Sequence, residues 1–365
     1  MTQYERVPDS EVRAGDLVAG PRGRELCARL AGMPVWDIRH QDAWSSTGGV
    51  ALVAGEPAAA DPVAVAELLG CDDDGEAACH FDRHDPLAGV PVLGDVAEDV
   101  NYWGGFPAAD PLEHPAVLAG IRATAGMVAA APGCQWWWSH LDLSAQRYVQ
   151  WTARDDPDDD YLPPPRPGQA ARMLRDGDRW AAKHEQSMHK YRRLPAGAGP
   201  GGPWWSCPFP GYFPTTRRLG SLGAVLLAGR EDGFGDTEAV LWPLAVAGAA
   251  RVYEIDGPAA WQHLVTAYPR TATATYRHTW AWTGWDGEWL VPHWAAAARD
   301  WDGIHLTVAG YLTTAGRVLP MAIARTLLAG WNPDETHWLA DVITPCGDPQ
   351  RWRNDDRSPL SWYEL

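Results

Sequence analysis

The hydrophobic pattern is clearest between Trp204 and Asp256, where short apolar runs alternate with turn residues. Gly223–Gly229 is an apolar run bounded by glycine, which is typical of a buried strand. Thr237–Leu244 and Arg251–Ile255 are rich in β-branched and aromatic residues and predict two more strands. Asp256-Gly257-Pro258 then predicts a helix over Ala259–Tyr268. The pattern therefore indicates an antiparallel meander backed by a helix.

Upstream of this stretch, apolar residues recur at helical spacing. They predict helices over Arg22–Leu30, Pro111–Ala131, about Asp142–Thr152 and Gln169–Leu194. The last of these contains His184-Glu185-Gln186-Ser187-Met188-His189, in which the two histidines are five residues apart. Histidines at this spacing point about 140° apart on a helix, so a zinc-protease motif is excluded, and Glu185 with His189 is predicted to be a stabilising pair.

An acidic, proline-rich run at Asp155–Gly168 is the strongest boundary signal in the chain. We therefore divide the sequence into a helix-rich N-terminal region (1–154), a connector (155–168) and an α+β C-terminal domain (169–365). The predicted fold class is α+β, with a helical N-terminal half and a tryptophan-rich, mostly antiparallel sheet in the C-terminal half.

Composition narrows the classes of function. The chain has 30 Lys and Arg against 47 Asp and Glu, a formal net charge of −17. Such a balance argues against a general binder of nucleic acid or of anionic membranes. The six cysteines follow no framework spacing and are expected to be reduced. The N-terminus has no signal-peptide pattern and Ala116–Ala131 resembles a core helix rather than a membrane span, so a cytoplasmic protein is expected.

Tryptophan is unusually frequent, with 22 residues against five phenylalanines. Indole rings stack on bases, sugars and cations, so an aromatic binding surface is one expectation. The segment Cys71–Asp85 gathers cysteine, histidine and aspartate, but its spacing matches no known zinc site, and no metal is predicted.

One polar run stands among aromatic residues in the central stretch. Thr215, Thr216, Arg217 and Arg218 lie beside four aromatic side chains, and a strand begins near Glu238 soon afterwards; the four are Trp204, Trp205, Tyr212 and Phe213. Hydroxyl and guanidinium groups next to aromatic rings suit a flat ring and a diphosphate.

The order of a hydroxyl pair, a strand, a turn, a glutamate and a strand resembles the second half of the ADP-ribosyltransferase fold. The resemblance covers about one seventh of the chain. It implies NAD as a substrate, with Glu238 stabilising a ribosyl oxocarbenium ion and Thr215, Thr216 and Arg217 near the diphosphate. Trp205 or Tyr212 would stack on nicotinamide. The hydroxyl run here is Pro-Thr-Thr, and the family's upstream arginine has only Arg147, Arg192 and Arg193 as candidates.

A second resemblance lies in Trp301–Gly316, which is similar to the last block of SGNH-type hydrolases. There an aspartate orients a histidine that is the general base for a serine, and Asp302 and His305 match by type and spacing. The family's N-terminal Gly-Asp-Ser is Gly-Asp-Leu in this chain at Gly15–Leu17, so the nucleophile is absent. In the ADP-ribosyltransferase interpretation, His305 and Thr307 would instead hold the nicotinamide ribose.

Three classes of function remain open. The first is an NAD-using ADP-ribosyltransferase or NAD glycohydrolase, with a small molecule or nucleotide as ligand and a protein as candidate acceptor. The second is a non-catalytic binding or interaction protein with an aromatic surface. The third is a hydrolase of small esters or carbohydrates, which would use Asp302 and His305 or a carboxylate pair such as Asp286 and Glu288.

Overall fold

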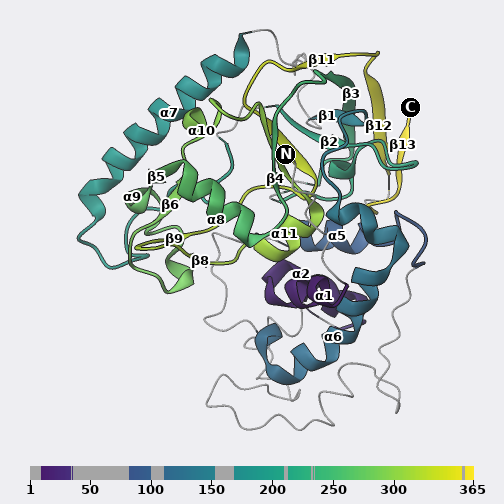
Figure 1. Cartoon of the computed structure of the whole chain (residues 1–365), viewed down its shortest axis with the longest axis horizontal. Coiled ribbons are helices and arrows are strands. Elements are labelled where there is room, and N and C mark those ends of the chain that lie inside the picture. Colours follow the sequence, from purple (N-terminus) through teal and green to yellow (C-terminus); the bar gives the residue numbers. More distant parts are fainter. Residues whose placement is uncertain are drawn as a thin grey trace, which may run out of the picture.

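The computed structural model describes residues 10–33, 35, 82–99, 111–152, 168–208, 213–231, 233, 235–355 and 358–365. Within them, helices lie mainly in the N-terminal half, and a large, mostly antiparallel sheet lies in the C-terminal half (Figure 1). The predicted α+β class is therefore confirmed.

The helices vary widely in length. The α-helices are α1 (Ser10–Ala19), α2 (Pro21–Leu30), α5 (Val90–Glu98), α6 (Pro115–Ala130), α7 (Gln169–Met188), α8 (Pro258–Ala267), α9 (Thr273–Tyr276), α10 (Trp294–Ala297) and α11 (Val308–Thr314). Short 3₁₀ turns are η2 (Pro111–Glu113), η3 (Pro132–Trp138), η4 (His189–Tyr191), η5 (Val225–Leu227) and η6 (Ala281–Thr283).

The main sheet has the strand order β13-β12-β3-β1-β2-β10-β7-β4, and β11 also pairs with β3. Its strands are β1 (Gln146–Trp151), β2 (Pro214–Arg217), β3 (Glu238–Val246), β4 (Val252–Ile255), β7 (Gly303–Leu306), β10 (Glu335–Trp338), β11 (Ile343–Pro345), β12 (Gln350–Asn354) and β13 (Trp362–Glu364). All pairs are antiparallel except β4 with β7. Two small hairpins pair β5 (Pro269–Thr271) with β6 (Leu290–Pro292) and β8 (Leu319–Pro320) with β9 (Arg325–Thr326).

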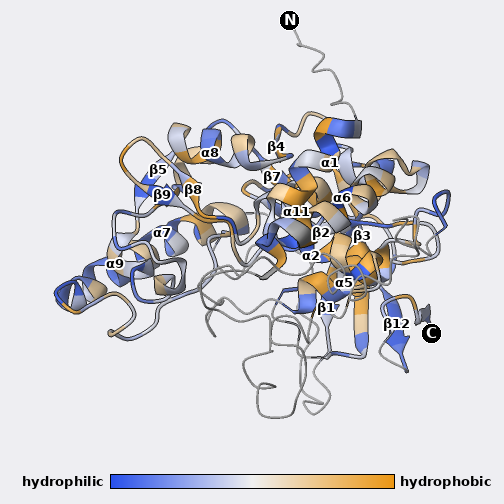
Figure 2. Ribbon diagram, turned by 90° about the horizontal axis from the view of Figure 1, so that it is seen from below, coloured by the Kyte–Doolittle hydropathy of each residue, from blue (hydrophilic) through white to orange (hydrophobic). Residues whose placement is uncertain are grey.

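The largest hydrophobic cluster joins the N-terminal helices to the sheet through α11. It combines residues of α1, α2, α5 and α6 with Ile304 and Leu306 of β7 and with the buried indoles of Trp261 and Trp331. Figure 2 shows many of the most hydrophobic residues around α11, α5 and β3. The helix α7 lies along the edge of the molecule opposite β12 and β13 (Figure 1).

Several predicted elements agree with the structure. α2, α6, α7 and α8 occupy the predicted helical segments, and β3 and β4 occupy two of the predicted strands. The carboxylate of Glu185 and the imidazole of His189 lie 3.9 Å apart on α7, as predicted for a stabilising pair.

Three expectations were wrong. The segment predicted as a helix near Asp142–Thr152 contains β1, because its alternating Gln146–Trp151 run pairs on both sides, with β2 and with β3. The apolar run Gly223–Gly229 forms η5, where all three residues are buried as in a strand but follow a helical turn. The meander is absent because β4 pairs in parallel with β7 rather than with β3. In the sequence, β1 comes before the expected connector. In the sheet, it lies between β3 and β2, which both come after the connector.

Close packing between α5 and η5 requires glycine at position 94. A Cβ atom there would lie 2.2 Å from the carbonyl oxygen of Ala228, a backbone atom that has no freedom to move aside. We expect Gly94→Ala to lower the free energy of unfolding by about 1–3 kcal/mol through overpacking. Gly126→Ala on α6 is the matched control, since nothing lies within 4 Å of its Cβ position, and alanine there should raise stability by up to about 1 kcal/mol. Urea unfolding of both variants checks the pair, and equal effects would contradict the packing explanation.

Candidate functional site

A row of polar side chains crosses one face of the main sheet. Thr215 of β2 lies opposite Thr336 of β10, which lies opposite His305 of β7, and His305 pairs in register with Glu254 of β4. Residues that are directly opposite in a sheet point to the same face, so these four share one. Thr336 and His305 are completely buried, and Thr215 is 1% exposed. A buried polar row in the middle of a sheet is uncommon, because each polar group needs a partner.

The partners form a continuous network of charges. The imidazole Nδ1 of His305 lies 2.5 Å from Glu254 Oε2, and its Nε2 lies 3.4 Å from Asp334 Oδ1. Arg217 Nε donates to the same Asp334 oxygen at 2.6 Å. The other oxygen, Oδ2, accepts from the backbone N–H of Arg217 at 2.9 Å and from the Thr216 hydroxyl at 3.1 Å. Two cations and two carboxylates are thus joined through Asp334.

An unusual backbone conformation positions Asp334. Its φ is 59°, in the left-handed region that aspartate tolerates better than most residues do. It ends the segment Asn332-Pro333-Asp334 directly before β10, so its carboxylate points back across the ends of β2 and β7.

Electrostatics in this interior favour the charged forms. Burial would lower the pKa of His305, but Glu254 and Asp334 overcome it and raise the pKa to about 9. Burial would likewise raise the pKa of Asp334, and the contacts with His305 and Arg217 lower it instead. His305 is therefore an imidazolium at neutral pH and is not a free base.

The segment directly after η3, residues 139–141, supplies hydrogen-bond partners to the network. Ser139 accepts a hydrogen bond from Arg217 Nη1 at 2.8 Å, and the carbonyl oxygen of His140 accepts one from Nη2 at 3.2 Å. The backbone N–H of Leu141 donates to Glu254 Oε1 at 3.0 Å. Each charged group is satisfied inside the protein, which indicates that the network holds the sheet and this segment together.

The predicted site residues Thr215, Thr216, Arg217 and His305 are thus brought together, although they contact protein groups. Thr215 donates to Gln146 and accepts from Trp338 Nε1. Thr307 is the N-cap of α11, where its hydroxyl accepts from the N–H of Gly310 at 2.8 Å. Trp205 lies elsewhere, in the pocket described below, and Tyr212 lies outside the described residues.

Glu238 lies away from this cluster. It begins β3 and pairs with Arg353 of β12 at 2.8 Å, and both side chains are more than 40% exposed. Thr215 lies opposite Tyr148, and Tyr148 lies opposite Trp242, four residues along β3 from Glu238. At about 3.4 Å per residue and about 4.8 Å per strand, Glu238 and Thr215 are separated by roughly 16 Å between Cα atoms.

The residues of the hydrolase hypothesis also have other partners. Asp302 binds the guanidinium group of Arg251, while His305 binds Glu254 and Asp334. The carboxylate of Asp286 forms an exposed pair with Arg277. In the structure, Asp302 does not supply the contact that orients His305.

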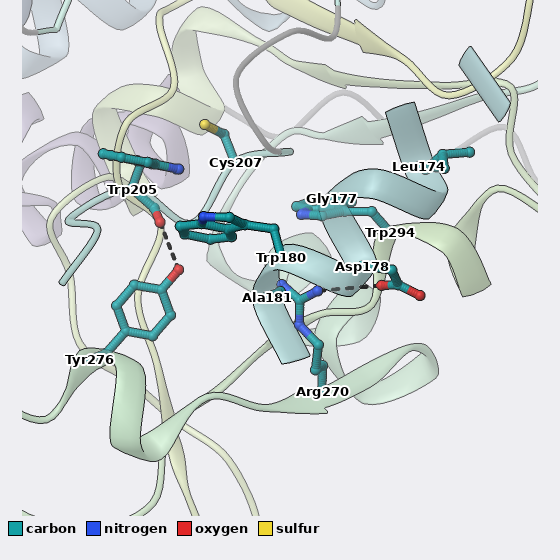
Figure 3. Close-up of a pocket in the computed structure, with 10 residues that line it drawn as sticks. All are labelled: Leu174, Gly177, Asp178, Trp180, Ala181, Trp205, Cys207, Arg270, Tyr276 and Trp294. Atoms are coloured by element: carbon teal, nitrogen blue, oxygen red, sulfur yellow. Dashed lines mark hydrogen bonds and ion pairs between the residues drawn. The ribbon is translucent and has the colours of Figure 1, made fainter. Parts of the chain in front are cut away.

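A small pocket, partly open to solvent, lies under α7 (Figure 3). Aromatic rings dominate its walls: Trp180 comes from α7, Trp205 from the segment between η4 and β2, Tyr276 from α9 and Trp294 from α10. The Tyr276 hydroxyl donates to the carbonyl oxygen of Trp205 at 2.7 Å, which fixes the two relative to each other.

Charged and sulfur-containing groups complete the pocket. Asp178 contacts Arg270 at 3.5 Å, and the Nε2 atom of His293 lies 3.2 Å from the same carboxylate. Cys207 lines the wall, and burial, followed by the charges of Glu335 and Glu231, raises the pKa of its thiol well above its usual value. This thiol is therefore protonated and a poor nucleophile.

Among the residues that line this pocket, Trp205 alone was predicted from the sequence to be a site residue. Trp180 and Asp178 lie on a helix that was correctly predicted, but α9, α10 and β5 reach them only through the tertiary fold. The high frequency of tryptophan was the signal that pointed toward an aromatic site.

Within the described residues, no group of three or more histidine, cysteine, aspartate or glutamate side chains is arranged to hold a metal ion. The Cys71–Asp85 segment is described only from Asp82 onward. Over the same described ranges, no single helix has the length and apolar character of a membrane span, although the bent pair Val117–Ala130 and Pro132–Trp138 matches by length and composition.

Comparisons with protein-family models, with curated proteins and with solved structures found no match to this chain. The functional proposal therefore depends on the site alone.

Proposed function

We propose that the pocket under α7 binds a flat, positively charged ring, with the oxidised nicotinamide ring of NAD as the first candidate. The observation that carries the proposal is that three indoles and one phenol surround a single opening that also contains a carboxylate; these residues are Trp180, Trp205, Trp294, Tyr276 and Asp178. Aromatic faces attract both flat rings and cations, and oxidised nicotinamide is both.

The local charge supports a cationic ligand. Burial is the largest cause of the raised pKa of the Cys207 thiol, and the carboxylates of Glu335 and Glu231 raise it further, so these two carboxylates add negative potential at this wall. Arg270 opposes this effect, but it is in contact with Asp178. The net charge of −17 acts in the same direction over a longer range.

The size of the pocket limits what it holds. It is small and partly open to solvent, so a ring would lie at its mouth among the aromatic side chains, with the ribose and diphosphate outside. If NAD is also cleaved, as the resemblance to ADP-ribosyltransferases implies, the bond between ribose C1′ and nicotinamide breaks and its electron pair leaves with nicotinamide. Water or an acceptor then bonds to C1′, and the proton that it loses passes to solvent. Asp178 lines this pocket and Glu238 does not, which favours Asp178 as the carboxylate that would stabilise the ribosyl cation.

Thermal unfolding with millimolar ligand tests the proposal. We expect NAD⁺ and 1-methylnicotinamide to raise the unfolding temperature and NADH, whose reduced ring is neutral, to have less effect. A ligand present at about 100 times its dissociation constant should add about 2.7 kcal/mol. Trp180→Ala should abolish the shift, because Trp180 lines the pocket and is only half-buried.

Trp242→Ala is the matched control, since this half-buried indole of β3 lies outside the pocket. It should lose some stability and keep the ligand shift. A shift that is equal for NAD⁺ and NADH would overturn the cationic ring as the recognised group, and no shift with any of the three compounds would overturn the proposal. Release of free nicotinamide, measured in the same samples, separates binding from turnover.

A further inference from the structure

The outer face of α7 carries a row of cations on an otherwise acidic protein. Arg172, Arg175, Arg179 and Lys183 lie on this helix, and their side chains reach solvent. At about 100° per residue they fall within roughly 80° of one another, and at about 1.5 Å per residue they extend over roughly 16 Å. We call these four residues the cationic stripe.

The acidic residues of α7 mostly point away from the cationic stripe. Asp178 turns into the pocket toward Arg270. Glu185 accepts hydrogen bonds from the backbone N–H groups of Ala274 and Thr275 at the start of α9. The remaining acid, Asp176, is exposed and pairs with Arg179. The fold therefore uses two of the three carboxylates internally and leaves the cations outside.

Further cations continue the positive surface past the end of α7. Lys190, Arg192 and Arg193 are exposed in η4 and the turn after it. Seven of the 30 cationic side chains and three of the 47 acidic ones lie in 169–194, which leaves 23 and 44 in the rest of the chain. Charge is thus strongly separated within the molecule.

We propose that the cationic stripe is a docking surface for a short acidic peptide segment of a partner protein. An extended peptide of about five residues has the length of the stripe, at about 3.3–3.6 Å per residue. Carboxylates at that spacing would meet four guanidinium or ammonium groups and gain charge-assisted hydrogen bonds.

A short acidic partner fits better than a nucleic acid. The phosphate backbone of a nucleic acid extends beyond the stripe and would pass into the field of the acidic remainder of the chain. The stripe itself has no aromatic side chain on which bases would stack, whereas binders of single strands depend on such stacking. An acidic peptide of matching length stays on the stripe, where Asp176 is the one exposed carboxylate of α7.

Fluorescence anisotropy with a fluorescein-labelled hexaglutamate peptide in about 50 mM salt tests the inference. We expect binding that weakens steeply between about 50 and about 300 mM salt, because the contacts are exposed ion pairs. The double variant Arg175→Glu/Arg179→Glu should weaken binding by at least about tenfold. Arg122→Glu/Arg299→Glu changes the net charge equally at sites on other elements and should leave the affinity within about twofold.

Three outcomes would overturn the proposal. If a short single-stranded DNA binds more tightly than hexaglutamate, the partner is a nucleic acid. If sedimentation at low salt shows self-association that Arg175→Glu/Arg179→Glu abolishes, the stripe is an interface between copies of this chain. Equal weakening by the stripe and control variants would show that only net charge matters. Circular dichroism of each variant confirms that α7 is still folded.

Discussion

Replacing Asp334 with alanine is expected to lower the free energy of unfolding by about 3–5 kcal/mol, the largest effect that we predict for a single substitution. Asp334 is 1% exposed and joins Arg217 and His305. Its removal takes the carboxylate away from Arg217 and leaves His305 paired with Glu254 alone, and a buried charge without a partner costs much more than an exposed one. Urea unfolding followed by tryptophan fluorescence measures the loss.

Two comparisons separate the charge from the shape of the side chain. Asp334→Asn keeps a residue that tolerates a φ of 59° and removes only the charge, so it should lose a large part of the same energy. Glu238→Gln breaks the exposed pair with Arg353 and should cost less than about 1 kcal/mol. If Asp334→Asn is as stable as the parent protein, the network is not a significant source of stability.

Stability should also fall as the pH rises through about 9, because His305 loses its proton there. An unfolded histidine has a pKa of about 6.5, so the raised pKa means that the fold favours the protonated form. Its contribution is fully present below about pH 6.5 and is lost as the pH rises through the folded value. The difference between the two values corresponds to about 3 kcal/mol.

Unfolding free energies measured at about pH 6, 8 and 10 in the parent protein and in His305→Gln check this expectation. The variant should be less stable at the lowest pH and should lose less as the pH rises. Asp334 has the opposite sign, since its lowered pKa makes its contribution disappear only as the pH falls into the acid range. Identical pH profiles for the parent and the variant would contradict a protonated His305 in the folded state.

Local patterns predicted the longer elements well. The sequence predicted α2 and α7 from their periodic apolar faces, and β3 from its β-branched and aromatic residues. Each of these patterns depends only on neighbours in the sequence. β1 and η5 were misread because both are short apolar or mixed runs whose form is decided by what packs beside them. Pairing of β4 with β7 depends on a crossover that no local signal encodes.

The sequence predicted some residues of the polar network as site residues, but not Asp334 or Glu254. Thr215, Thr216, Arg217 and His305 were predicted to be site residues, and the structure places three of them, Thr216, Arg217 and His305, in contact with Asp334. The contact of His305 with Glu254 joins residues 51 positions apart and exists only because β4 and β7 are adjacent. The role of the Asp334 carboxylate depends on the packing of β2 and β7 against the segment that contains it, which no local pattern encodes.

The position of β1 has a practical consequence for making fragments of this protein. The composition of the acidic 155–168 stretch suggests a domain boundary there. A fragment that ends in this stretch would contain β1 without β2 and β3, which are its hydrogen-bonding partners. Such a fragment exposes two strand edges and the apolar side chains beside them, which favours aggregation. The complementary fragment has a gap in the middle of its sheet. Expression should therefore keep both sides of the stretch in one polypeptide, or produce the two pieces together so that β1 inserts between β2 and β3.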